Sequence, residues 1–109
     1  MKTILLAEVV GEFAEDKDAA AKLRREVILP ALASGETVEI DFAGVSLTTQ
    51  SFIHALISQA LREHGEEALA RMKFKNCQTA PRGIVETVVQ YVLESREAED
   101  SSEDGWLEN

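Results

Sequence analysis

The pattern of apolar and polar residues along the chain predicts three strands. Residues 3–10, TILLAEVV, are aliphatic and β-branched and end at Gly11, which is typical of a strand closed by a turn. Residues 36–42 alternate between apolar and polar types, and residues 71–75 do the same. Because these strands have one polar face, one side of their sheet should meet solvent. We therefore expect a two-layer α/β fold, in which a small mixed sheet of three to four strands carries helices on one face.

Three other segments repeat apolar residues at intervals of three and four, as amphipathic helices do. The first begins near Glu15 and reaches Pro30, which lacks a backbone donor, so this helix either ends near Ile28 or kinks there. The second is predicted over Gln50–His64 and the third from about Pro81 to Leu93. The alternation of strands and helices predicts one domain for a chain of 109 residues.

Charge divides this chain into a body and a tail. The net charge is −9, and residues 94–109 hold seven acids and one base, which leaves about −3 for the rest. We expect a domain over residues 1–94 and a disordered acidic tail over residues 95–109. Trp106 in the tail either anchors a partner or belongs to a charged, solvated segment that only keeps the protein in solution. Since clustered Lys and Arg are lacking, binding to nucleic acid or to an anionic membrane is not expected.

Candidate chemistry is sparse. The single Cys77 cannot form an internal disulfide, and one thiol with two distant histidines does not make a metal site, so we expect no metal and no cofactor. Ser51 and His54 share a helix face, yet no glycine-flanked nucleophile turn accompanies them, so no catalytic residue is expected. Asp41 is either a functional carboxylate at a strand end or one that closes the turn before Gly44. Without a signal peptide or a membrane span, a cytoplasmic protein is expected.

Hydroxyl side chains gather where the chain enters the helix predicted over Gln50–His64. The free N–H groups of a helix N-terminus favour an anion or a phosphorylated hydroxyl, whereas Thr48 or Thr49 could equally serve as a helix cap. On a helical wheel, the outward arc of this helix is polar and largely uncharged. It consists of Ser51, His54, Ala55, Ser58, Gln59 and Arg62.

The residues at this entry carry a family resemblance. The run DFAGVSL, residues 41–47, followed by TTQSF resembles the signature of STAS domains, the fold of bacterial anti-sigma factor antagonists. Asp41, Phe42, Val45 and Ser46 match its first half. The second half departs, with Thr49 at the aspartate position of the turn, Gln50 at the phosphorylated serine, Ser51 at the next serine and Phe52 at the glycine. Ser51 followed by Phe52 is similar to the divergent STAS-like family.

The resemblance extends over roughly residues 4–91, through VVGEF at residues 9–13 and MKFKN at residues 72–76. It implies regulation by protein binding rather than a reaction. STAS antagonists bind an ATPase of the histidine-kinase type, and phosphorylation of the serine at the helix start blocks that binding. Because Gln50 replaces the usual phosphoacceptor, Ser51 or Thr49 would carry such a switch here.

The resemblance and the polar arc together predict a non-enzymatic regulatory module that docks a protein partner, such as a histidine-kinase-like ATPase. The predicted docking surface consists of Thr48, Thr49, Gln50, Ser51, His54, Ser58 and Arg62. Two other classes of function stay open. Relative to a full STAS domain the sheet lacks strands at its edges, so the chain could complete it as a homodimer. Alternatively, its acidic surface could occupy the basic cleft of an enzyme, as an antitoxin or inhibitor does.

Overall fold

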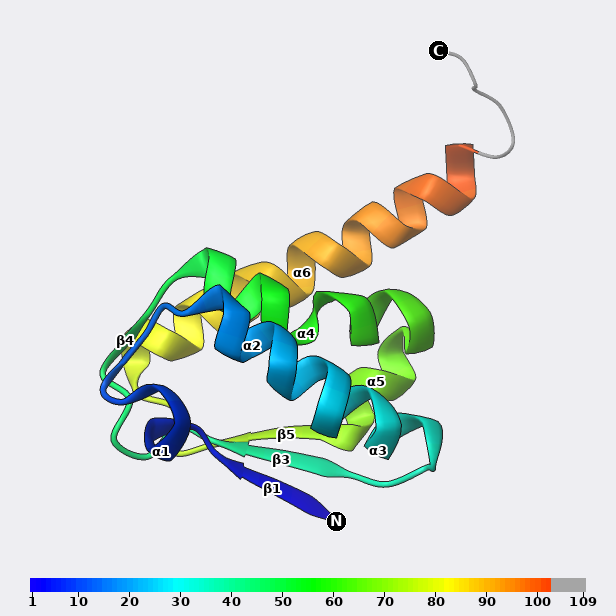
Figure 1. The fold of residues 1–109 in the computed structure, drawn as a ribbon. Helices are drawn as coiled ribbons and strands as arrows, with labels where there is room; N and C mark the ends of the chain where they lie inside the picture. The colour runs from blue at the N-terminus through cyan, green and yellow to red at the C-terminus, as the bar shows by residue number, and fades with distance from the viewer. Residues whose placement is uncertain (103–109) are drawn as a thin grey trace.

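The computed structural model describes residues 1–102, the last seven of them by their backbone alone. Strands and helices alternate along the chain, and the helices gather above the sheet (Figure 1). The elements are β1 (Lys2–Leu5), α1 (Leu6–Val10), β2 (Phe13–Ala14), α2 (Lys17–Leu23), the π-helical turn η1 (Arg24–Ile28), α3 (Leu29–Ala33), β3 (Val38–Asp41), β4 (Leu47–Thr48), α4 (Gln50–His64), α5 (Glu66–Arg71), β5 (Met72–Lys75) and α6 (Thr79–Ser102).

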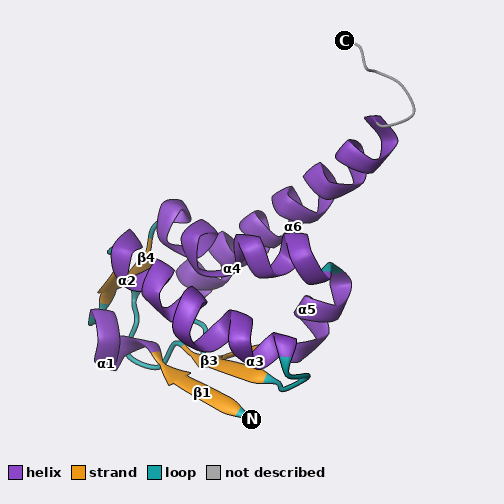
Figure 2. Ribbon diagram, turned by 45° about the vertical axis from the view of Figure 1, so that its right-hand side comes forward, coloured by secondary structure: helices purple, strands orange, loops and turns teal. Residues whose placement is uncertain are grey.

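The main sheet has the strand order β1-β3-β5, and β2 pairs with β4 in a separate two-stranded ladder. All of these described pairings are parallel, with Ile4 opposite Ile40 and Ile40 opposite Phe74. Helices cover one face of the sheet, so the two-layer α/β prediction is confirmed (Figure 2). The mixed sheet expected from the sequence is parallel in its described pairings, because a helical crossover returns the chain to the same end before each next strand.

The alternation of side chains in β3 and β5 follows the sequence prediction. Val38 and Ile40 are buried beneath the helices, whereas Glu39 on the opposite face is partly exposed. In β5, Met72 is buried and Lys73 is exposed. The polar face of the sheet therefore meets solvent.

The strand predicted over residues 3–10 is wrong in its second half. β1 ends at Leu5, and α1 begins at Leu6, whose side chain is fully buried. Leu5 lies opposite Asp41, the last residue of β3, so no partner strand remains beyond this point. The same aliphatic residues then form a helical turn, which satisfies their backbone groups internally. Gly11, with φ of +79°, ends that helix rather than a strand.

The first predicted helix kinks at Pro30 instead of ending before it. The N–H of Leu29 bonds to the carbonyl of Arg24, five residues back, and helical structure continues into α3. Pro30 lacks an N–H, and the wider π-helical turn accommodates that missing bond. Ala31 and Leu32, beyond the kink, remain buried in the core.

The second predicted helix is confirmed at Gln50–His64, and the third is longer than predicted. α6 starts at Thr79 instead of Pro81 and continues past Leu93 to Ser102, beyond the body of the domain (Figure 1). Val85, Val88 and Val92 are buried, as a helical spacing requires. The division at residue 94 stays a prediction, and the Trp106 segment lies outside the described residues.

The core lies between the sheet and α4. This helix contacts both α2 and α6, so it is flanked on two sides as well as supported from below. Phe52, Ile53, Leu56 and Ile57 are completely buried. The helix that begins at the predicted docking surface is therefore rigidly seated.

Candidate functional site

The connection from β3 to α4 is anchored at both ends. Phe42 and Val45 are fully buried, and Gly44 turns the chain with φ of +86°. A Cβ at Gly44 would lie 3.2 Å from the Cβ of Ala7, so a larger residue would be strained in both conformation and space. The turn therefore depends on this glycine.

Beyond that turn, the segment that enters α4 is held against the segment that enters α2. The N–H of Ser46 donates to the carbonyl of Glu12 at 2.9 Å, and the N–H of Thr49 donates to the carbonyl of Ala14 at 3.2 Å. β4 and β2 pair between these bonds. This ladder brings the N-termini of α2 and α4 together.

Three of the hydroxyls at the helix entry are used within the fold. Thr49 Oγ1 accepts the N–H of Phe52 at 3.0 Å, which confirms helix capping by this residue. Thr48 donates its hydroxyl to the carbonyl of Ala14 at 2.8 Å, and Ser46 donates to Glu12 Oε2 at 2.8 Å. The capping interpretation thus accounts for Thr49, and a ladder contact accounts for Thr48.

Ser51 differs from these residues. It is exposed in the first turn of α4, and its hydroxyl has no hydrogen-bond partner among residues 1–102. The neighbouring Gln50 is also exposed. Among the hydroxyls predicted as phosphoacceptors, Ser51 is therefore the one open to a modifying enzyme.

A shallow, open depression lies beside Ser51. Its volume is about 440 Å³, and its lining residues are Lys17, Gln50, Ser51, His54 and Ala55. The structure thus brings together three residues of the predicted docking surface. Lys17, the first residue of α2, was missed because its place beside α4 depends on helix packing that no local pattern reports.

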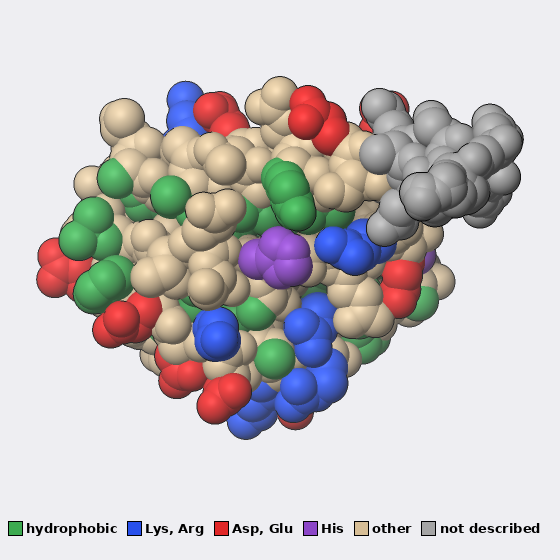
Figure 3. Space-filling view, turned by 90° about the horizontal axis from the view of Figure 1, so that it is seen from above, with side chains coloured by type: hydrophobic (Ala, Val, Ile, Leu, Met, Phe, Trp, Pro, Cys, Tyr) green, Lys and Arg blue, Asp and Glu red, His purple; other side chains and the backbone are tan. Residues whose placement is uncertain are grey.

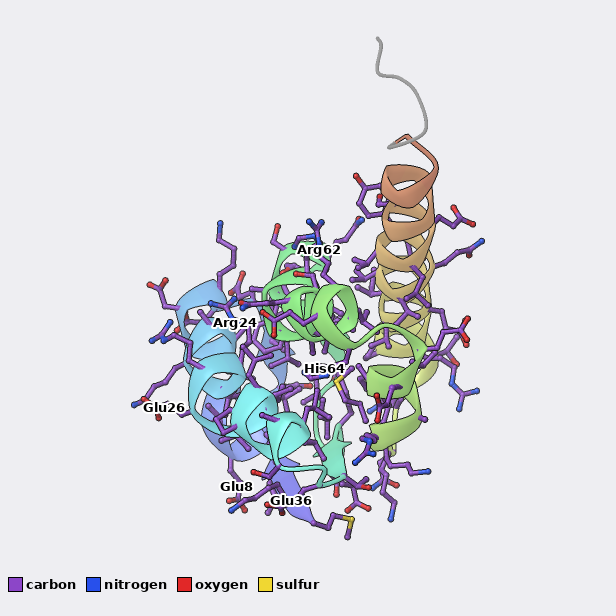
Figure 4. The ribbon with its side chains drawn as sticks, turned by 90° about the vertical axis from the view of Figure 1, so that its right-hand side faces the viewer. Glu8, Arg24, Glu26, Glu36, Arg62 and His64 are labelled. Atoms are coloured by element: carbon purple, nitrogen blue, oxygen red, sulfur yellow. The ribbon has the colours of Figure 1, made fainter. Side chains whose placement is uncertain are left out.

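The predicted outward position of Ser58 is wrong. Ser58 was placed on the outward arc of α4, but it is only 9% exposed. α2 and α6 flank α4, so this helix has less exposed surface than the helical wheel suggests, and Ser58 is buried. Arg62 is exposed near the other end of the helix, on the side of the molecule where Arg24 also lies (Figure 4). Arg24 Nη1 donates to the carbonyl of Ala55 at 3.0 Å and so ties η1 to α4.

Basic side chains gather on part of the helical face of the molecule. Seen from above the helices, Lys and Arg side chains gather beside a histidine, with acidic side chains toward the margins (Figure 3). The basic residues on α2, η1 and α4 are Lys17, Lys22, Arg24, Arg25 and Arg62. At the start of α2, beside the depression, Lys17 stands between the exposed acids Asp16 and Asp18, whereas Arg24 and Arg25 lie on η1 and Arg62 lies near the end of α4.

Exposed apolar residues lie together on the β2–β4 ladder. Phe13 is 46% exposed and lies opposite Leu47, which is 52% exposed, in the β2–β4 ladder. Val9, also exposed, belongs to α1, which contacts β2. Grouped exposed apolar residues of this size mark interaction surfaces more often than scattered ones do. No local pattern in the sequence predicts this group, because Phe13 and Leu47 meet only through the ladder.

Asp41 closes a turn, as one of its two interpretations predicted. Its Oδ1 accepts the side-chain N–H of Asn76 and the backbone N–H of Ala43, each at 2.9 Å. The Asn76 bond first, then the Ala43 bond and the nearby charge of Lys75, hold the pKa of this carboxyl below its usual value. Asp41 thereby links the end of β3 to the residue after β5.

We expect Asp41→Asn to destabilise the protein at neutral pH but not in acid. Because the folded state lowers the pKa of Asp41, the stabilisation is complete above the unfolded pKa of about 4 and is lost as pH falls through the lower folded pKa. Urea unfolding of both proteins at pH 7 and pH 3 measures this, with the exposed Glu15→Gln as a control. A stability difference that stays constant across this range would contradict the assignment.

Cys77 is half-buried, and burial raises the pKa of its thiol. That environment is typical of a structural cysteine rather than a reactive one. In the described part of the chain, no group of three or more His, Cys, Asp or Glu side chains could hold a metal ion. Among residues 1–102, no helix combines the length and apolar content that crossing a membrane requires.

Comparison with family models gives one match, described as a STAS-like domain of unknown function (DUF4325), over residues 19–80. This range runs from α2 to the start of α6 and covers more than half of the chain. No curated protein and no solved structure matches. The match agrees with the resemblance carried by residues 41–52.

Proposed function

The chain belongs to this STAS-like family, and from that premise we propose that it is a non-enzymatic regulatory module of the cytoplasm that binds a protein partner at the start of α4. The docking corner, as we name it, consists of the depression at Lys17, Gln50, Ser51, His54 and Ala55 together with Phe13 and Leu47. The observation that carries the proposal is the open depression beside Ser51, which lies at the end of the ladder that holds the exposed pair Phe13 and Leu47. Apolar anchors beside complementary charge are what protein interfaces use.

The shape of the corner supports binding over catalysis. The depression is shallow and open to solvent, whereas sites for small molecules enclose most of their ligand. The hydroxyls of Thr48 and Thr49 are engaged in the ladder and the cap, so they serve the fold. A broad, open surface on rigid elements suits another protein.

The charge of the corner indicates what its partner presents. Lys17 in the depression favours an acidic group on the partner, and Phe13 with Leu47 favours an apolar contact beside it. We propose an ATPase of the histidine-kinase type, the partner class of the STAS domains that this chain resembles.

Ser51 is the proposed regulatory residue of the corner. A phosphate there would add about two negative charges to the docking corner, where Lys17 lies in the same depression. The phosphate would also be stabilised by the free N–H groups at the start of α4. Modification of Thr49 would instead remove the cap on Phe52, so Ser51 is the better candidate.

We expect Ser51→Asp to lose partner binding and Ser51→Ala to keep it, since only the first places a negative charge in the depression. The partner is first identified by photo-crosslinking in the native host from position 54, with position 73 on the opposite face of the sheet as the control. Calorimetric titration of the purified partner then compares the two variants. Equal binding by both variants would contradict the proposed switch at Ser51. Equal crosslinking from positions 54 and 73 would contradict the proposed docking corner.

A further inference from the structure

The two edges of the main sheet differ in how they are protected. β5 forms one edge and carries the exposed Lys73 and Lys75, and such lysines prevent pairing with another chain. β1 forms the other edge, where Thr3 and Leu5 are exposed on the outer face without any charge. The one charged residue of β1, Lys2, lies on the helix side of the strand, so the outer face of this edge carries no charge against a further strand.

The free backbone groups of β1 can be assigned from its pairing. The N–H of Lys2 donates to the carbonyl of Thr37, on the side of β3. Because successive residues of a strand direct their N–H groups to opposite edges, Thr3 and Leu5 offer theirs to the open side. These donors require a partner strand or water.

An apolar groove runs along the same edge. Its volume is about 270 Å³, and it is lined by Thr3, Ile4, Leu5, Glu8, Val9, Leu23 and Val27. Two acids lie at this flank: Glu8 lines the groove, and Glu26 precedes Val27 on η1 (Figure 4). The occupant should therefore combine an apolar stem with a positive charge.

We propose that the groove and the β1 edge bind a second copy of this chain, in a two-fold dimer with antiparallel β1 strands. A two-fold axis through Thr3 pairs Thr3 with Thr3 of the other copy. The same axis pairs Leu5 of each copy with Met1 of the other. Lys2 of the other copy then lies opposite Ile4 on the helix side, because Lys2 and Ile4 share one face of the strand. Its aliphatic stem covers the apolar groove, and its ammonium group meets Glu8.

This dimer accounts for both the open backbone groups of β1 and the apolar groove beside them. The open N–H groups of Thr3 and Leu5 gain acceptors, and the two sheets join into one of six strands. The interface is isologous, since each copy contributes the same strand and the same groove. Ser51 lies on α4 and not on β1, and the depression beside it shares no lining residue with the groove.

The proposal predicts that the protein dimerises through Thr3. In sedimentation velocity runs at rising concentration, the unmodified protein is expected to form a dimer. Thr3→Lys and Thr3→Glu should each weaken dimerisation about tenfold or more, because two like charges would then face each other across the axis. An equimolar mixture of these two variants should dimerise again, since opposite charges then meet.

Ala70→Lys is the matched control, because it adds a lysine at an exposed position of α5. It should dimerise as the unmodified protein does. Circular dichroism tests whether the Thr3 variants are folded, and recovery on mixing separates loss of pairing from misfolding. A monomer at every concentration, or a dimer insensitive to both Thr3 variants, would overturn the proposal.

Discussion

Phe42→Ala is expected to lower the free energy of unfolding by about 3–5 kcal/mol. The side chain of Phe42 is fully buried, and its ring centroid lies 6.4 Å from that of Phe74, so truncation removes buried apolar area and leaves a cavity. Domains of this size are stable by only about 5–15 kcal/mol, so the variant would be close to unfolding. Urea denaturation followed by circular dichroism measures the change.

Phe13→Ala is the matched control, because it is the same chemical change at a residue that is 46% exposed. We expect it to cost about 1 kcal/mol or less, since little buried surface is lost. If the two variants were equally stable, Phe42 would not be the anchor of the connection between β3 and α4.

The second large effect concerns partner binding. Replacing both Phe13 and Leu47 by serine is expected to weaken binding of the partner about 30-fold, or about 2 kcal/mol, because the exposed pair would lose its role as an apolar anchor. The melting temperature should change little, since both side chains are already near half exposed. Calorimetric titration and thermal unfolding of the same samples measure the two quantities.

Tyr91→Ser serves as the control for this variant. Tyr91 is 58% exposed on α6, so it removes a large exposed side chain outside the docking corner. Its partner affinity should equal that of the unmodified protein. If Tyr91→Ser weakened binding as much as the double variant, the partner would contact α6 and the docking corner would be misplaced.

Rigid support is what the fold contributes to the proposed function. α4 is held by the capping bond from Phe52 to Thr49, by the bond from Arg24 to Ala55, and by its buried apolar side. Ser51 and His54 therefore lie on a helix whose position does not need to be organised on binding, which lowers the entropic cost of association. A phosphate on Ser51 would act through charge and not through a change of fold.

Local patterns determined much of this protein. The alternation of Val38 and Ile40 with polar residues predicted a sheet with one covered face. The spacing of apolar residues predicted α4 with its correct first and last residues. The residues from Asp41 to Phe52 carried the STAS-like family, which the family match confirms. These features depend on short-range periodicity and on adjacent residues, which the sequence displays directly.

Only the tertiary structure decided which residues meet across the chain. Ser58 belongs to the polar arc of α4, but α2 and α6 flank that helix and the residue is buried. Lys17 joins Ser51, and Phe13 joins Leu47, because the β2–β4 ladder aligns two segments more than thirty residues apart. β1 likewise ends where β3 offers no further partner, although its aliphatic run continues. These features depend on pairing and packing between segments that are far apart in the sequence, so local patterns cannot predict them.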